Sequence, residues 1–158
     1  MAVHFYLNDC KRYNKFLKRI NIKLKLVITY MSESFNKIYI WSEKFAILKA
    51  KIKSMRIFQN AFAFVCDKNE ITVVMDQSKV DECVDEILAI ERDWKIITFD
   101  LELPFELVGF IAKISTALAE EGISIFVISA YSTDHILVKE KDLPKAIKKL
   151  EKIGFTLK

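Results

Sequence analysis

Residues 94–102, Trp94-Lys-Ile-Ile-Thr-Phe-Asp-Leu-Glu102, decide the fold because apolar and polar side chains alternate along them. The apolar residues fall on one face and the polar residues on the other: Ile97, Phe99 and Leu101 against Thr98, Asp100 and Glu102. A period of two residues is typical of a strand with one buried face. The stretch therefore predicts a strand at the edge of a hydrophobic core.

The segments after this strand complete a regular order of helices and strands. Helical spacing of apolar residues predicts a helix that Gly122 ends and a later helix with Pro144 in its first turn. In chain order the expected helix, strand, strand, helix and strand are residues 107–121, 123–130, 135–139, 142–153 and 155–157. Together with the first strand this is the ferredoxin-like βαββαβ order, so we predict an α+β fold with both helices on one face of an antiparallel sheet.

The chain before Trp94 predicts a second set of elements. Its expected strands are residues 38–41, 45–51, 61–66 and 71–75. Asp67-Lys-Asn-Glu70 is predicted to be a hairpin loop, and Ser78 starts a helix with Asp81 in the capping-box position. The second face of the C-terminal sheet needs cover, and this first half could provide it.

The first thirty residues differ in charge from the rest of the chain. They carry a net charge of +6, whereas the residues from Met31 onward carry −2, which gives no electrostatic reason to bind nucleic acid. The apolar run Ile20–Tyr30 contains two lysines and is shorter than the ~20 residues that span a bilayer, so we expect no membrane segment. We expect residues 1–30 to be a dispensable or mis-started extension, with a basic arm as the alternative. An N-terminal half over 31–93 and a C-terminal half over 94–158 follow.

The composition of the 158-residue chain excludes several classes of protein. Three glycines cannot supply a Walker loop or a GxGxxG fingerprint. Three cysteines without a CxxC exclude a four-cysteine zinc site and a disulfide framework, and two histidines argue against a histidine-rich metal site. We therefore expect no cofactor, no metal and a reducing cytoplasmic compartment.

Three stretches of the C-terminal half resemble the ACT domain family: residues 103–110 (LPFELVGF), 121–126 (EGISIF) and 128–143 (ISAYSTDHILVKEKDL). The sequence is most similar to the small tandem ACT proteins, which are related to aspartokinase regulatory domains and to cytosolic arginine sensors. The similarity is close over about residues 94–155 and weak over 38–90. It implies two ACT-like halves in tandem and a regulatory, non-enzymatic protein that holds an amino acid at the interface between them.

The resemblance also implies where the ligand lies. Backbone N–H groups at the start of the helix after residue 103 suit a carboxylate, and Gly109 permits close approach. By analogy with the arginine sensors, Asp134 receives the ammonium group and Tyr131 walls the pocket, while Thr72 and Val73 align with the strand that completes it from the other half. The ligand-binding residues so implied are Thr72, Val73, Glu106, Leu107, Val108, Gly109, Ala130, Tyr131, Ser132 and Asp134.

Each of these residues also has a purely structural interpretation. Asp134 is a common turn residue, Gly109 can relieve crowding, and Glu106 interacts favourably with a helix dipole. Ala130 stands where many relatives carry Thr or Ser, so one hydroxyl is absent. His135 follows Asp134, but neighbouring strand residues point to opposite faces, so we expect no catalytic pair.

Three classes of function remain open. The leading class is an amino-acid-binding regulatory protein that forms a homodimer or acts on a regulated partner protein. The second is a ligand-free ACT-like protein-interaction module. The third is a small enzyme, which we disfavour because Glu70, Asp134 and His135 are too scattered in the sequence to form a site.

Overall fold

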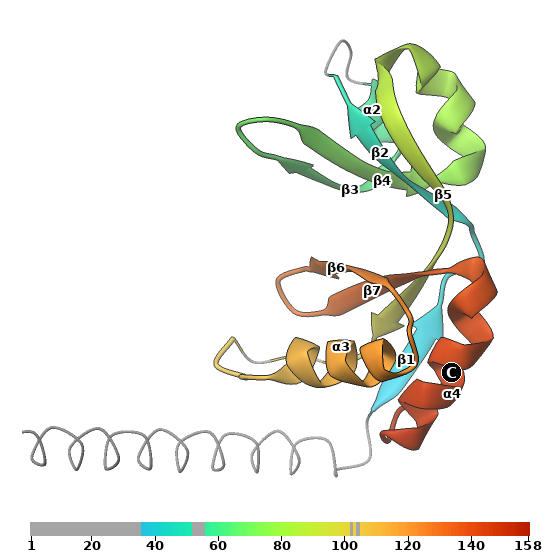
Figure 1. Cartoon of the computed structure of the whole chain (residues 1–158). Coiled ribbons are helices and arrows are strands. Elements are labelled where there is room, and N and C mark those ends of the chain that lie inside the picture. The colour runs from blue at the N-terminus through green and yellow to red at the C-terminus, as the bar shows by residue number, and fades with distance from the viewer. Residues whose placement is uncertain (1–35, 52–55, 102, 104) are drawn as a thin grey trace, which may run out of the picture.

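The computed structural model of the chain describes residues 36–51, 56–101, 103 and 105–158, so the predicted extension at 1–30 lies outside the described residues. The elements are β1 (Lys37–Ile40), β2 (Phe45–Ala50), α2 (Arg56–Gln59), β3 (Ala61–Cys66), β4 (Ile71–Asp76), the 3-10 helix η1 (Gln77–Glu86), β5 (Ile87–Phe99), α3 (Phe110–Glu120), β6 (Ile125–Ser129), β7 (Asp134–Lys139), the 3-10 turn η2 (Glu140–Asp142), α4 (Leu143–Lys152) and β8 (Thr156–Leu157). They form two units that share β5 (Figure 1). The N-terminal unit runs from β2 to the first half of β5, and the C-terminal unit runs from the second half of β5 to β8.

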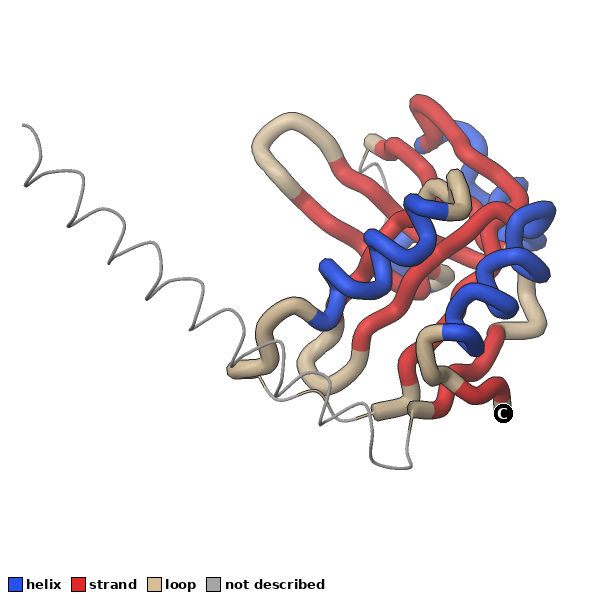
Figure 2. The backbone as a smooth tube through the Cα atoms, turned by 60° about the horizontal axis from the view of Figure 1, so that its bottom comes forward, coloured by secondary structure: helices blue, strands red, loops and turns tan. Residues whose placement is uncertain are grey.

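The C-terminal unit has the predicted ferredoxin-like order. Strand β7 pairs antiparallel with both β5 and β6, and α3 and α4 contact each other on one face of the sheet (Figure 2). The alternation at 94–102 places Ile97 and Phe99 in the core, where both are fully buried. The Phe99 ring contacts the rings of Phe110 and Phe155 at 5.1 and 5.0 Å between centroids. The predicted α+β class is confirmed.

The N-terminal unit repeats the order strand, helix, strand, strand, helix, strand in a smaller form. Its strands lie in the order β3, β4, β2, β5. The predicted hairpin loop is present, because the Asp67 carboxylate accepts the backbone N–H groups of Asn69 and Glu70 at 2.6 and 2.8 Å. Its core is built from Ala46, Leu48, Ala50, Ile57, Val73, Met75, Val80 and Cys83.

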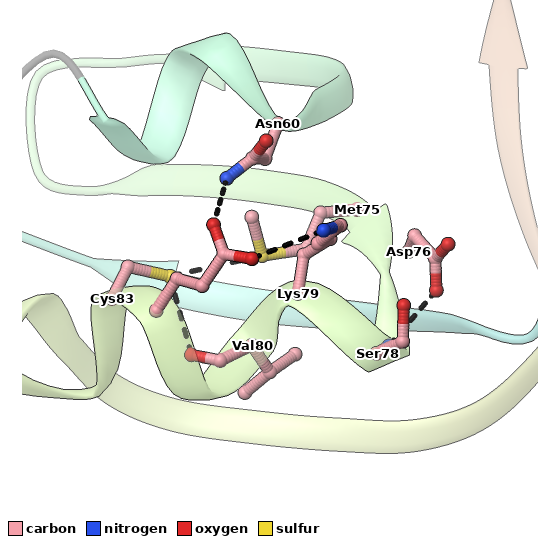
Figure 3. A network of polar contacts seen from close by, with 8 residues as sticks. Asn60, Met75, Asp76, Ser78, Lys79, Val80 and Cys83 are labelled. Atoms are coloured by element: carbon pink, nitrogen blue, oxygen red, sulfur yellow. Dashed lines mark hydrogen bonds and ion pairs between the residues drawn. The ribbon is translucent and has the colours of Figure 1, made fainter.

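The helix expected from Ser78 is the 3-10 helix η1, and its cap differs from the prediction. The Asp76 side chain accepts the Ser78 N–H at 2.8 Å, so Asp76 is the N-cap and the predicted Ser78–Asp81 capping box is wrong (Figure 3). Asp76, at the end of β4, accepts a backbone N–H group that has no partner within the helix, so the helix is capped earlier than the sequence predicted. Backbone angles at Cys83 are not helical, which interrupts η1 before it meets β5.

Strand β1 belongs to the predicted N-terminal half, residues 31–93, but pairs with strands of the predicted C-terminal half, residues 94–158. It lies antiparallel to β5, with Ile38 opposite Phe99, and parallel to β8, so it belongs to the sheet of the C-terminal unit. Strand β5 runs without a break through the boundary between these halves. The described strands β1 and β2 lie one after the other along β5 and are not paired with each other. Residues 41–44 are therefore a crossing between the units.

Lys95 holds this crossing segment. Its side chain is buried, and its Nζ donates to the backbone carbonyls of Ser42 and Glu43 at 2.6 and 2.9 Å. We expect Lys95→Met to lower the free energy of unfolding by about 1.5–3 kcal/mol, because two carbonyls lose a charged donor. Urea denaturation measures the change beside Lys79→Met, whose exposed ion pair contributes less than about 1 kcal/mol. Equal losses in the two variants would contradict this role of Lys95.

The N-terminal unit packs on the face of β5 that carries Thr98 and so covers the second face of the C-terminal part of the sheet. Thr98 on this face is 1% exposed. Trp41 Nε1 donates to Thr98 Oγ1 at 2.9 Å, and the same oxygen lies 2.8 Å from His135 Nδ1. Phe62 meets the His135 ring edge-on at 5.2 Å. An apolar cluster surrounds these groups and joins the units: Phe45, Val74, Trp94, Ile96 and Leu137.

Candidate functional site

A cavity of about 180 Å³ lies between the loop before α3 and the turn between β6 and β7. The two segments are tied together, because Leu103 N–H donates to the Ser132 carbonyl at 3.2 Å. The turn closes on itself through a bond from Ala130 N–H to the Thr133 carbonyl at 2.9 Å. This space, the Asp134 cavity, is lined by Leu103, Phe105, Leu107, Phe110, Ser129, Ala130, Tyr131, Ser132, Thr133 and Asp134.

Helix α3 starts beside this cavity at a glycine. Gly109 is the N-cap residue with φ +91°, and no side chain there caps the helix. The predicted helix start at Leu107 is therefore wrong by three residues, because the left-handed backbone of Gly109 cannot lie inside an α-helix. The first N–H groups of a helix have no partner within it and carry its positive dipole end. The first residue of α3, Phe110, lines the cavity.

Two exposed aromatic side chains form the rim of the cavity. Phe105 is 75% exposed and Tyr131 is 85% exposed, yet their rings meet edge-on at 4.9 Å between centroids. Phe105 comes from the loop before α3 and Tyr131 from the turn after β6, so the rim spans both segments. Val108 nearby is also half exposed. The site thus presents apolar surface to solvent at the place where the loop and the turn converge.

Some of the implied ligand-binding residues come together in the Asp134 cavity and others do not. Those that line it are Leu107, Ala130, Tyr131, Ser132 and Asp134. Glu106, Val108 and Gly109 belong to the same loop but lie outside its lining. Val73 is fully buried in the core of the N-terminal unit, where its side chain is closed to a ligand. Thr72 lies at a second cavity.

This second space, the inter-unit cavity, has a volume of about 250 Å³ and lies between the hairpin β3–β4 and the edge strand β6. In Figure 1 the hairpins β3–β4 and β6–β7 extend to the same side of β5. Ser129 lines both cavities. The inter-unit cavity is lined by Ala63, Phe64, Val65, Thr72, Val74, Phe126, Val127, Ile128 and Ser129.

The residues of the Asp134 cavity that the sequence did not indicate are mainly apolar: Leu103, Phe105, Phe110, Ser129 and Thr133. Phe105 could have indicated the site, because it is a large aromatic residue in a loop between a predicted strand and a predicted helix. Tyr131, which contacts Phe105 in space, could have indicated it in the same way, because it is a large aromatic residue in a turn. Neither pattern shows that the two rings meet, because that contact depends on how the turn folds back onto the loop.

Asp134 and His135, which are neighbours in the sequence, do not share one site. Asp134 lines the cavity, whereas the adjacent His135 is buried against Thr98 on the other face of β7. Burial lowers the pKa of His135, and the Asp134 carboxylate opposes this shift. Burial also raises the pKa of the Cys83 thiol, which favours the unreactive protonated form. In the part of the chain that the structure describes, no cluster of three or more His, Cys, Asp and Glu side chains is placed to hold a metal ion.

No helix in the described ranges is both long and apolar enough to cross a membrane.

Comparison with known protein families finds a match in the C-terminal part of the chain. The family model of the ACT domain matches residues 89–152. None of the curated protein sequences is significantly similar to this chain. The matched segment contains both parts of the Asp134 cavity.

Solved structures share the fold of both units. A protein from Agobacterium tumefaciens has a TM-score of 0.66 at 21% identity, covering 79% of this chain and 93% of its own. A Vibrio cholerae protein of unknown function, described as a possible transport protein, has a TM-score of 0.66 at 22% identity, covering 81% and 95%. The ligand-free regulatory subunit of aspartate kinase from Thermus thermophilus has a TM-score of 0.55 at 8% identity, covering 73% and 95%. Identities this low establish the common fold alone.

Proposed function

Because residues 89–152 match the family model of the ACT domain, we propose that this protein is a non-enzymatic regulatory protein that binds a free amino acid. The observation that carries the proposal is the Asp134 cavity, whose lining includes both Asp134 and Phe110, the first residue of α3. A free amino acid carries one ammonium and one carboxylate group. We expect the Asp134 carboxylate to bind the ammonium group and the first N–H groups of α3 to bind the carboxylate.

The chemistry of the two ends fits this ligand. The Asp134 carboxylate accepts hydrogen bonds from an ammonium group, and such charge-assisted bonds are stronger than neutral ones. The first N–H groups of α3 suit the ligand carboxylate, because they point out of the helix at its positive dipole end. Gly109 leaves that approach open, since a Cβ built there meets no atom within 4 Å.

The ligand lies in the C-terminal unit and close to its contact with the N-terminal unit. Ser129 lines both the Asp134 cavity and the inter-unit cavity that Thr72 faces. If the β6–β7 turn moves when the ligand binds, Ser129 would move with it and alter the contact between the units. Regulation requires that the ligand bind one arrangement of the units better than another.

We expect one amino acid to raise the melting temperature of the full chain by several degrees. Ligand at 100 times its dissociation constant adds about 2.7 kcal/mol to the free energy of unfolding. In Asp134→Ala the affinity should fall at least about tenfold, because the ammonium group loses its charged partner. Isothermal titration calorimetry of the variant and of the exposed control Asp81→Ala measures this loss. Failure of all twenty amino acids to bind would refute the proposal.

A second candidate function is a ligand-free interaction module. The exposed rim of Phe105 and Tyr131 favours it, because exposed apolar surface often marks a contact with another protein. The partner would be a second copy of the chain or a regulated protein. A flat amino-acid screen together with a dimer seen by light scattering that Phe105→Ala disrupts would support this candidate. We further propose a reducing, cytoplasmic compartment, because Cys66 is exposed as a free thiol.

A further inference from the structure

We propose that the amino acid bound in the Asp134 cavity has a large apolar side chain, aromatic or branched aliphatic. The proposal rests on the proposed function of the site and adds the class of ligand. It follows from the side chains that line the cavity, from the charges that are missing there, and from its size.

The wall of the cavity is dominated by large apolar and aromatic side chains. They are Leu103, Phe105, Leu107, Phe110 and Tyr131. Leu103 and Leu107 are half-buried and pack on the core of the C-terminal unit, and Phe110 is buried in it, which fixes the inner wall. Phe105 and Tyr131 project from the rim and remain largely exposed. A ligand side chain held between the inner wall and the rim would remove both sets of apolar surface from water.

The charges along the wall argue against amino acids with charged side chains. Among the lining residues that the structure describes, Asp134 alone carries a carboxylate and none is cationic, and the ligand ammonium group uses Asp134. A lysine or arginine side chain would then need a second acid, but the nearby Glu106 lies in the exposed part of the loop and outside the lining. An aspartate or glutamate side chain would need a cation, which none of the described lining residues supplies. A charged side chain without a partner is costly to move from water into an apolar wall.

The volume of the cavity suits a side chain of this size. The Asp134 cavity has a volume of about 180 Å³ and opens to solvent at the exposed rim of Phe105 and Tyr131, so a ring or a branched chain can lie along its apolar wall. The aromatic pair at the rim adds specificity, because rings prefer edge-to-face or offset contacts with another ring. We expect a ligand ring to lie against Phe105 and Tyr131, the aromatic pair at the rim.

The test is calorimetric titration of the full chain with single amino acids. The probes are L-phenylalanine and L-leucine on one side, and L-lysine, L-arginine, L-aspartate and L-glutamate on the other. We expect phenylalanine or leucine to bind at least about tenfold more tightly than any charged amino acid. Tyr131→Ala should weaken that binding severalfold, whereas Tyr131→Phe keeps the ring and should bind as the native protein does. Tyr131 is 85% exposed, so neither variant should change the melting temperature of the free protein.

The outcomes separate this inference from the proposed function. Tighter binding of a charged amino acid, lost in Asp134→Ala, would overturn the apolar class and leave the amino-acid-binding function intact. Absence of binding by every amino acid would overturn both. Phenylalanine or leucine binding that Tyr131→Ala leaves unchanged would overturn the assignment of the side chain to this cavity.

Discussion

Phe99→Ala should lower the free energy of unfolding by about 3–5 kcal/mol, the range found when a buried phenylalanine is truncated. Phe99 is fully buried at the end of β5, between the rings of Phe110 and Phe155. Its removal opens a cavity that these two rings cannot fill without moving. Phe110 also lines the Asp134 cavity, so the inner wall of the site should loosen as well. Urea unfolding gives the first effect, and titration with the bound amino acid gives the second.

Phe105→Ala is the matched control, because it makes the same substitution on an exposed ring. Phe105 is 75% exposed, so its loss should change the free energy of unfolding by no more than about 0.5 kcal/mol. It should still weaken ligand binding, since Phe105 lines the rim of the cavity. Similar stabilities for the two variants would show that Phe99 is not at the centre of the core.

Acid should weaken the contact between the two units through His135. Trp41 Nε1 donates to Thr98 Oγ1, and the same oxygen lies 2.8 Å from His135 Nδ1, so the imidazole is held in the buried contact between the units. Burial lowers the pKa of His135 below its ordinary value of 6.5. The unfolded chain therefore takes up a proton that the folded chain resists. The stabilising contribution is complete above pH 6.5 and declines as the pH falls toward the pKa of the folded state.

The expected slope is at most that of one proton, about 1.4 kcal/mol per pH unit. Unfolding by urea between pH 7.5 and 5.5 measures it, because the carboxylates mostly titrate below this range. His135→Gln retains a hydrogen-bonding side chain beside Thr98 but does not titrate, so its stability should change less over the same range. Parallel pH profiles for the native chain and the variant would show that His135 is not the group responsible.

Several strands, turns and helix ends in both units follow from local sequence patterns. The alternation at 94–102 predicts a strand, and the Asp67–Glu70 loop predicts a hairpin, because the side chains that decide both lie within a few residues of each other. Gly122 predicts the end of α3 for the same reason. The motifs at 103–110 and 128–143 also located the loop and the turn that form the Asp134 cavity.

Contacts between distant residues decided the rest. The sequence could not show that β1 joins β5 and β8, since strand pairing depends on partners about sixty or more residues away. Val73 and Thr72 are neighbours in the sequence, yet the pleat of β4 turns one into the core and the other toward the inter-unit cavity. The packing of the two units buries Thr98 and His135, although their residue types fit an exposed face equally well. Local patterns thus determined the elements of this protein and the segments of its site, whereas tertiary packing decided which side chains meet there, because that depends on the fold of the whole chain.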